Sequence, residues 1–471
     1  MEGPNNKNLI LAMVLSTLVI AVWMILFPPP AVDPNAPVTA DGQAALPPAG
    51  SSDLPQPEAA TDAVTEAQPV LDAARLTIDT PALAGSISML GGRFDDLRLK
   101  SYRETLDPAS AEVTLLSPVG TDDAFYALYG WAPGAGLGYE DVPGPQSEWK
   151  LVSGATLRPG EPVTLQWENG KGLVFTREIS VDDRFMFSVT DTVKNAGAQP
   201  VSLQAYGLIR RHGLPKDLQN IFVVHEGVIG RADGELTETD YKDVIDLPMV
   251  EREKAAAELT EAAVDGWIGF TDHYWMAVLV PEQGKPHTQV TKYAAASDVY
   301  QTEVRQPVMT VAAGETASST SRFFAGAKEW ATIRAYQNEP GALDRLFGAK
   351  TTAEAPIPGF IDSIDWGWFY FLTKPIFAVL HWLHALIGNM GWAIIALTFV
   401  LKIIVLPLAY KSYVSMARMK ELQPEMEALK ERAGEDRQKM QREMMQLYKD
   451  KKVNPAAGCL PILIQIPIFF A

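Results

Sequence analysis

An apolar run of 20 residues, Met390 to Ala409, contains a single charged residue, Lys402. A helix needs about 20 apolar residues to cross the hydrocarbon core of a bilayer, so the run predicts a membrane-spanning helix. A lysine near the centre of such a helix costs roughly 2.5–3.5 kcal/mol on insertion scales, and it therefore has to face water, protein or an anion. Thr398 precedes it by four residues and lies on the same helix face. We expect a spanning helix with one polar face.

A second apolar run lies near the start of the chain, where 19 residues from Leu9 to Phe27 carry no charge. Its length favours an uncleaved membrane anchor, residues 1–27, over a cleaved signal peptide, whose apolar core is usually about 7–15 residues. Lys7 on the short leading segment predicts a cytoplasmic N-terminus. Residues 28–70 begin with three prolines and are rich in Pro, Ala, Asp and Ser, which predicts a flexible linker.

Charge is distributed unevenly along the chain. The net charge is −17, whereas residues 411–452 hold eleven Lys and Arg against eight Asp and Glu. Basic segments beside membrane spans stay in the cytoplasm, so this stretch is predicted to be cytosolic and the acidic bulk to be exported. Helical patterns at Met416 to Ala433 and Asp436 to Lys451 flank Gly434-Glu435 and predict an antiparallel helical hairpin. The lack of a large basic surface argues against nucleic-acid binding. A single cysteine, Cys459, excludes an intrachain disulfide.

Residues 71–335 are predicted to form a separate all-β domain. Val163–Trp167 and Leu173–Ile179 alternate between polar and apolar residues on either side of a turn at Asn169–Gly172, which is typical of antiparallel strands. Further strands are predicted at residues 185–193, 201–208, 267–270, 274–280 and 303–311. Met249 to Ala263 is instead predicted to be a short helix. The extent of the region suits a large twisted β-sandwich.

The last part of the chain is apolar in three segments. Residues 359–386 are interrupted by Lys374 and Pro375 and are dense in Trp and Tyr, so we predict an amphipathic helix lying on the membrane, with a full span as the alternative. Residues 387–409 are predicted to cross from outside to inside. Residues 458–471 begin a further span, but as a helix they cover only about 21 Å of a ~30 Å core. The chain is therefore expected to be a fragment of a longer protein.

Polar and adaptable side chains in the helical region are the candidate binding residues. Gln465 either hydrogen-bonds a neighbouring helix or shares a wet recess with Thr398 and Lys402. Lys402 either lines that recess or extends its ammonium group to the cytosolic headgroups, about 10 Å away. The hairpin methionines either hold its two helices together or form an adaptable surface for apolar partners. They are Met416, Met419, Met426, Met440, Met444 and Met445.

No catalytic, cofactor or metal site is predicted. His381 and His384 are three residues apart but have no third ligand nearby, so contact with lipid headgroups is the better interpretation. His273, His225 and Glu226 are isolated residues, for which packing on strand surfaces is the simpler interpretation. The sequence has no phosphate-binding loop, nucleophile motif or zinc spacing.

Four segments of the C-terminal region resemble the YidC-type membrane protein insertases of Gram-negative bacteria. They are GWFYFLTKP (Gly367–Pro375), Gly388–Leu408, Ser415–Arg432 and Met444–Phe469. The resemblance implies a multi-domain, multi-pass protein of the bacterial inner membrane. Its parts would be a periplasmic β-supersandwich like that of sugar mutarotases, an interfacial helix, an α-helical transmembrane core of five spans and a cytosolic hairpin.

The family receives a hydrophilic part of its substrate in a groove that is open to cytosol and lipid. An arginine is the hallmark of that groove. The matching residue here is Lys402, which keeps the charge but not the bidentate fork of arginine. Thr398 and Gln465 match other groove-lining positions.

The resemblance implies an insertase or membrane chaperone, not an enzyme, that inserts and helps fold inner-membrane proteins alone or with the Sec translocon. The partners expected are nascent membrane proteins, the lipid bilayer, and the ribosome or signal recognition particle pathway. The alternative is a membrane-anchored periplasmic carbohydrate-binding protein or mutarotase-like enzyme, which would need a His/Glu pair converging in one cleft. A transporter would need charged spans or inverted repeats, and neither is visible in the sequence.

Overall fold

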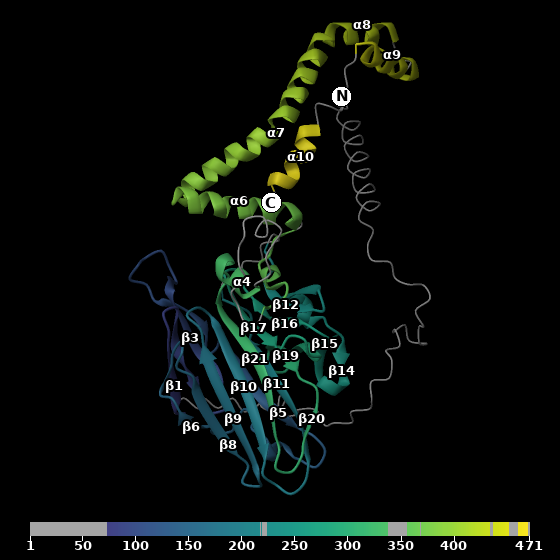
Figure 1. Ribbon diagram of the computed structural model, residues 1–471. Coiled ribbons are helices and arrows are strands. Elements are labelled where there is room, and N and C mark those ends of the chain that lie inside the picture. Colours follow the sequence, from purple (N-terminus) through teal and green to yellow (C-terminus); the bar gives the residue numbers. More distant parts are fainter. Residues whose placement is uncertain are drawn as a thin grey trace, which may run out of the picture. The chain divides into compact units, whose positions relative to one another are not determined.

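The computed structural model describes residues 73–216, 218, 224–337, 356–367, 369–433, 437–451 and 460–469 (Figure 1). The predicted anchor at residues 1–27 and linker at residues 28–70 lie outside these ranges, as does the predicted hairpin turn at Gly434-Glu435. Within the described residues, a β domain is followed by a helical region.

Two large sheets make up the β domain, and nearly all their strand pairs are antiparallel. The first has the order β14-β15-β18-β19-β11-β5-β3-β2-β1-β7, with β20 paired to β11 and β4 to β3. Its strands are β1 Arg75–Asp79, β2 Leu83–Ser88, β3 Arg93–Arg103, β4 Glu112–Leu116, β5 Phe125–Pro133, β7 Thr156–Leu157, β11 Val201–His212, β14 Met249–Val250, β15 Ala255–Ala262, β18 His287–Ala294, β19 Val299–Arg305 and β20 Met309–Val311.

The second sheet has the order β13-β12-β16-β17-β21-β10-β9-β8-β6. Its strands are β6 Lys150–Ser153, β8 Val163–Glu168, β9 Leu173–Val181, β10 Met186–Asn195, β12 Gly227–Ala232, β13 Glu235–Asp240, β16 Gly266–Thr271, β17 Trp275–Pro281 and β21 Thr316–Ala327. The short helices η1 Tyr139–Asp141, α3 Tyr241–Ile245 and η2 Glu251–Glu253 lie in the connections.

One continuous apolar core joins the two sheets. Alternation places every second side chain of β9 and β10 inward, and their register pairs Ile179 with Val189. Phe94 of the first sheet meets Phe187 and Phe323 of the second at ring-centroid distances of 5.3 and 5.5 Å in edge-to-face geometry. The predicted all-β sandwich is confirmed.

The predicted helix at Met249–Ala263 is wrong. The segment forms β14, η2 and β15, and β15 pairs in antiparallel register with β18 along its whole length. Its alanines alternate, with Ala255 and Ala257 buried, but alanine is too weakly hydrophobic for this alternation to stand out against its helix propensity. The predicted strand at 303–311 is likewise divided between the end of β19 and β20.

The helical region comprises α4 Trp330–Gln337, η3 Phe360–Ser363, α6 Tyr370–Ile387, α7 Met390–Glu421, α8 Gln423–Ala433, α9 Arg437–Asp450 and α10 Leu460–Phe469. Phe360 is fully buried against Trp267, Phe324 and Tyr336, so η3 is part of the β-domain core. Among the described residues, α6 and α7 are long and apolar enough to cross a membrane.

Candidate functional site

α7 is the helix on which the predicted site residues Thr398 and Lys402 lie, and two cap residues fix where it begins. Gly388 ends α6 in the left-handed conformation (φ 77°), and its N–H donates to the carbonyl of His384. Asn389 then caps α7 by accepting from the backbone N–H of Trp392. The 32 residues of α7 extend about 48 Å, so the helix continues beyond a ~30 Å hydrocarbon core.

Thr398 and Lys402 lie on one side of α7, and both are exposed. The Thr398 hydroxyl donates to the carbonyl of Ile394 at 2.9 Å, which satisfies it within the helix. Within the described part of the chain, Lys402 has no hydrogen bond or ion pair of its own. The ammonium group is thus available to an external anion or to water.

The opposite side of α7 is the one that packs. Ala393 is fully buried, and nine residues of helix place it about 180° around the axis from Lys402. α6 and α7 are in contact. Several large apolar side chains of α7 remain at least 45% exposed, among them Trp392, Phe399 and Ile403. Such a surface requires lipid or further helices.

Gln465 lies on α10, which contacts α7. Its side chain is exposed. The third predicted groove residue is therefore on a helix that neighbours the other two. No hydrogen bond joins it to Thr398 or Lys402 in the described structure.

The predicted hairpin is formed by α8 and α9, with α7 leading into it. Lys451 Nζ lies 2.7 Å from Glu425 Oε1, and the Tyr448 hydroxyl lies 3.5 Å from Met426 Sδ, so the arms are antiparallel. Pro424 has no N–H to continue the α7 hydrogen-bond ladder, which explains the break at Leu422. The first arm therefore begins at Gln423 and not at Met416.

The predicted methionines divide between the two environments. Met416 and Met445 are 48% and 71% exposed. Met426 packs beside Tyr448, and the remaining members, Met419, Met440 and Met444, are half-buried. Met416 and Met419 belong to α7, and the other four to α8 and α9.

The histidines do not assemble a site. His225 is held through both ring nitrogens, by Asp240 at 2.9 Å and by the Val228 carbonyl at 3.0 Å. His381 packs on the Trp330 ring. Among the described residues, no group of three His, Cys, Asp or Glu side chains could hold a metal ion.

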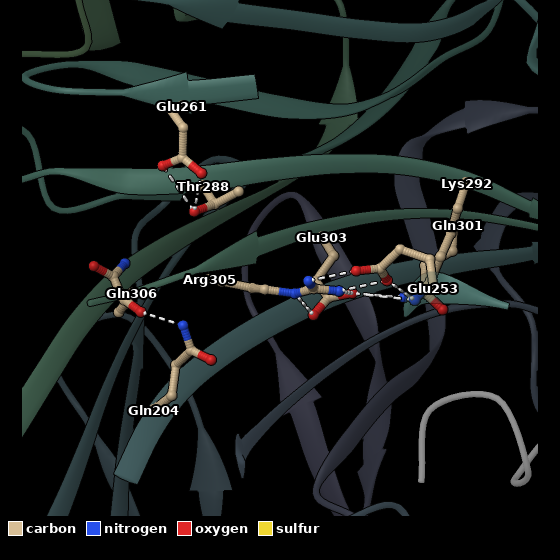
Figure 2. Close-up of polar contacts among 9 residues, drawn as sticks. All are labelled: Gln204, Glu253, Glu261, Thr288, Lys292, Gln301, Glu303, Arg305 and Gln306. Atoms are coloured by element: carbon tan, nitrogen blue, oxygen red, sulfur yellow. Dashed lines mark hydrogen bonds and ion pairs between the residues drawn. The ribbon is translucent and has the colours of Figure 1, made fainter. Parts of the chain in front are cut away.

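A buried ionic cluster in the β domain was not predicted from the sequence (Figure 2). Arg305 makes paired contacts with Glu253, at 2.8 Å from each guanidinium nitrogen, and its Nε lies 2.7 Å from Glu303. Lys292 reaches both carboxylates, at 3.2 and 3.5 Å, and Gln301 donates to Glu303 at 2.9 Å. Gln301, Glu303 and Arg305 are spaced two residues apart on one face of β19, whereas Glu253 on η2 and Lys292 on β18 come from elsewhere in the sequence.

Two carboxylates, Glu253 and Glu303, meet two cations, Lys292 and Arg305. The buried Arg210 is a third cation nearby, and its Nε donates to Gln301 at 2.6 Å. Glu303 is fully buried. Burial by itself raises the pKa of its carboxyl, but Arg305 and Lys292 outweigh burial and lower that pKa to about 2. Each carboxylate of the cluster has a cationic partner, and leaving one of these charges unpaired would destabilise the β15–β18–β19 region.

These elements define the class: a protein that combines a large β domain with two helices long and apolar enough to cross a membrane and a charged helical hairpin. Residues 75–379 match the family described as YidC periplasmic domain, and residues 382–471 match the family described as 60Kd inner membrane protein.

Named relatives agree with both matches. The chain is 64% identical over 467 residues to the membrane protein insertase YidC of Cereibacter sphaeroides (strain KD131), covering 99% of this chain and 73% of that protein. It is 55% identical to the membrane protein insertase YidC of Jannaschia sp. (strain CCS1), covering 99% and 76%. The chain belongs to the YidC family of membrane protein insertases.

Solved structures with similarity to the β domain are distant. A galactose mutarotase related enzyme from Lactobacillus acidophilus is 8% identical with a TM-score of 0.36, covering 54% of this chain and 97% of its own. A putative aldose 1-epimerase from Escherichia coli is 13% identical with a TM-score of 0.34, covering 54% and 98%. Similarity at this level supports no inference about activity.

Proposed function

We propose that the chain inserts proteins into the inner membrane through the polar face of α7, with Lys402 as the attracting charge and Thr398 and Gln465 beside it. The observation that carries this proposal is that Lys402, a cation inside the apolar run of α7, is exposed and has no partner in the described structure. Relatives of the chain are named as membrane protein insertases. The chain acts as an insertase and not as an enzyme.

The physical basis is a local reduction of the barrier to translocation. A fixed cation in a partly desolvated recess attracts the carboxylates of a short exported tail. Water around Lys402 and Thr398 shortens the apolar path which that tail has to cross. Transfer of the substrate's own apolar helix into lipid then supplies the driving force.

The topology follows from the charges. The N-terminus and the α8–α9 hairpin are cytoplasmic, and the β domain is periplasmic. Exposed methionines, Met416 and Met445 in particular, give the hairpin side an adaptable apolar surface for nascent membrane proteins. We further propose the Sec translocon and the ribosome or signal recognition particle pathway as partners, because the resemblance to YidC-type insertases implies them.

The test compares three variants of the full-length protein in reconstituted vesicles. Lys402→Ala removes the charge, Lys402→Arg retains it, and Lys411→Ala removes an exposed lysine one residue beyond Tyr410 on the same helix. The substrate is a single-span protein with an acidic translocated tail, paired with a version in which its Asp residues are Asn.

The attraction between Lys402 and the acidic tail is expected to be worth roughly 1–2 kcal/mol, which lies between the energies of exposed and buried ion pairs. Its loss in Lys402→Ala predicts an insertion rate about 5- to 30-fold lower for the acidic tail. Lys402→Arg and Lys411→Ala are expected to insert it normally, and the Asn tail is expected to be insensitive to all three. Undiminished insertion of the acidic tail by Lys402→Ala would refute the role of Lys402.

A further inference from the structure

One end of the β-sandwich gathers exposed apolar and aromatic side chains. Leu106, at the tip of the β3–β4 loop, is fully exposed, and Tyr274, in the β16–β17 turn, is 62% exposed. Tyr102 joins the two: its ring packs edge-to-face on Trp275 at 5.0 Å, and its hydroxyl donates to Glu329 at 2.7 Å, just before α4. We define the aromatic end by Tyr102, Leu106, Tyr274, Trp275 and Trp330.

The opposite end of the sandwich has a different composition. Its turns, at residues 169–172, 196–200 and 312–315, are joined by backbone hydrogen bonds from Ala196 to Gly172 and from Gly314 to Asn195. They read NGKG, AGAQP and AAGE, without an aromatic residue or a leucine. β21 runs from the polar end to the aromatic end, which separates them by about 40 Å.

The aromatic end is also where the chain leaves the domain for its apolar helices. Ser363 ends η3, which is buried in the domain core, and Tyr370 begins α6 seven residues later. Seven residues span at most about 25 Å, so this end stays close to α6 in any arrangement of the tether. Lys374 of α6 lies 2.5 Å from Asp362 of η3, and the Trp330 ring meets Phe377 at 5.5 Å.

We propose that the aromatic end of the β domain rests on the outer surface of the phospholipid bilayer. Trp and Tyr combine an apolar ring with a polar group and concentrate at the membrane–water interface. The exposed members, Leu106 and Tyr274, enter the headgroup layer. Tyr102 and Trp275 support them from the domain, and Trp330 continues the contact onto α6. The aromatic end is continuous with α6, and α6 contacts the apolar helix α7. We therefore infer that lipid, and not a separate protein, covers the aromatic end.

The test uses the full-length protein with Cys459→Ser, which removes the single cysteine of residues 1–471, and with any cysteine outside these residues replaced by serine as well. An environment-sensitive fluorophore is attached at Tyr274→Cys, at Leu106→Cys, or at the control Ala198→Cys on the exposed polar end. Each protein is reconstituted in vesicles of phosphatidylethanolamine and phosphatidylglycerol. A share of these lipids carries a doxyl quencher near the headgroup end of the acyl chain, and iodide reports access from water.

A probe within the interfacial layer, which is about 5–8 Å deep, is expected to be quenched by doxyl lipid roughly twofold or more strongly than the Ala198 probe. It is also expected to be quenched less by iodide. Equal doxyl quenching at all three positions would overturn the proposal. So would probes at Tyr274 and Leu106 that neither quencher reaches, because protein would then cover this end. Both substitutions are at exposed positions, and an unchanged midpoint of thermal unfolding, followed by the fluorescence of the buried Trp131 and Trp267, verifies that the labelled β domain is folded.

Discussion

Replacing Glu303 with glutamine tests whether the β domain depends on the pairing of charges in the buried ionic cluster. Glu303 accepts from Arg305 Nε at 2.7 Å and from Gln301 at 2.9 Å, and it faces Lys292 at 3.5 Å. Glutamine keeps the shape and some of these hydrogen bonds but removes the charge. Arg305 and Lys292 are then left with Glu253 as the single carboxylate of the cluster.

An uncompensated charge at a fully buried position sets the magnitude. Removing one partner from a buried ion-pair network costs about 3–5 kcal/mol. For a domain of this size, each kcal/mol lowers the midpoint of thermal unfolding by about 2–4 °C, so Glu303→Gln is expected to lower it by roughly 6–20 °C. Trp131 and Trp267 are buried in the domain core, and their fluorescence reports the transition.

Two further variants separate charge balance from simple loss of contacts. Glu261→Gln alters an exposed carboxylate that contacts Thr288 on the neighbouring strand, and it is expected to shift the midpoint little. Combining Glu303→Gln with Lys292→Met removes one charge of each sign and keeps the net charge of the cluster, so the double variant is expected to lose less than the two single losses added together. An unshifted midpoint for Glu303→Gln, or strict additivity in the double variant, would refute the reasoning.

Three other outcomes are expected. The pKa of Glu303 in the folded protein is about 2, below its ordinary value of 4.5. The stabilisation from its ionised carboxylate is therefore fully present above about pH 5 and is lost as the pH falls toward 2. Unfolding midpoints measured across this range should show the loss in the wild type and little of it in Glu303→Gln. Phe360→Ala empties a fully buried ring position and is expected to cost about 3–5 kcal/mol in the same unfolding assay, whereas an unchanged midpoint would show that η3 is not anchored. Met445→Gln is expected to weaken photo-crosslinking of nascent substrates to the hairpin without changing the hydrogen exchange of the hairpin. Met426→Gln should instead speed that exchange, because it loosens the contact between residue 426 and Tyr448. The reverse pattern would contradict the division between outward and inward methionines.

The sequence predicted those parts of the fold in which local pattern and tertiary environment agree. β8, β9 and β10 alternate strongly enough to identify their strands and, approximately, their ends. Lys402 was found because a charge within an apolar run is unusual in itself. Helix α7 was predicted as a span, but its continuation to Glu421 was not predicted. The residues between Ala409 and Pro424 neither require a helix nor forbid one.

What the sequence did not reveal depends on contacts between distant segments. β15 is a strand because it pairs with β18, a partner about 30 residues away that overrides the helix propensity of its alanines and glutamates. The ionic cluster joins Glu253 to Glu303 and Arg305 across about 50 residues, so each appears as an ordinary surface charge in the sequence. Whether Gln465 faces Lys402 likewise depends on how α10 is rotated about its own axis. Hydrophobic periodicity predicts that rotation poorly, because α10 is apolar on all sides.

Pro407 lies inside the continuous helix α7, between Lys402 and the hairpin. Proline has no N–H, so the carbonyl of Ile403 has no backbone donor within the helix. The helix therefore bends most easily about one and a half turns beyond Lys402. The arm from Pro407 to Glu421 is about 21 Å long, and a bend of 20° at the proline moves its far end by about 7 Å. In the topology proposed above, a partner that docks on the hairpin can thus swing it while Lys402 stays in place.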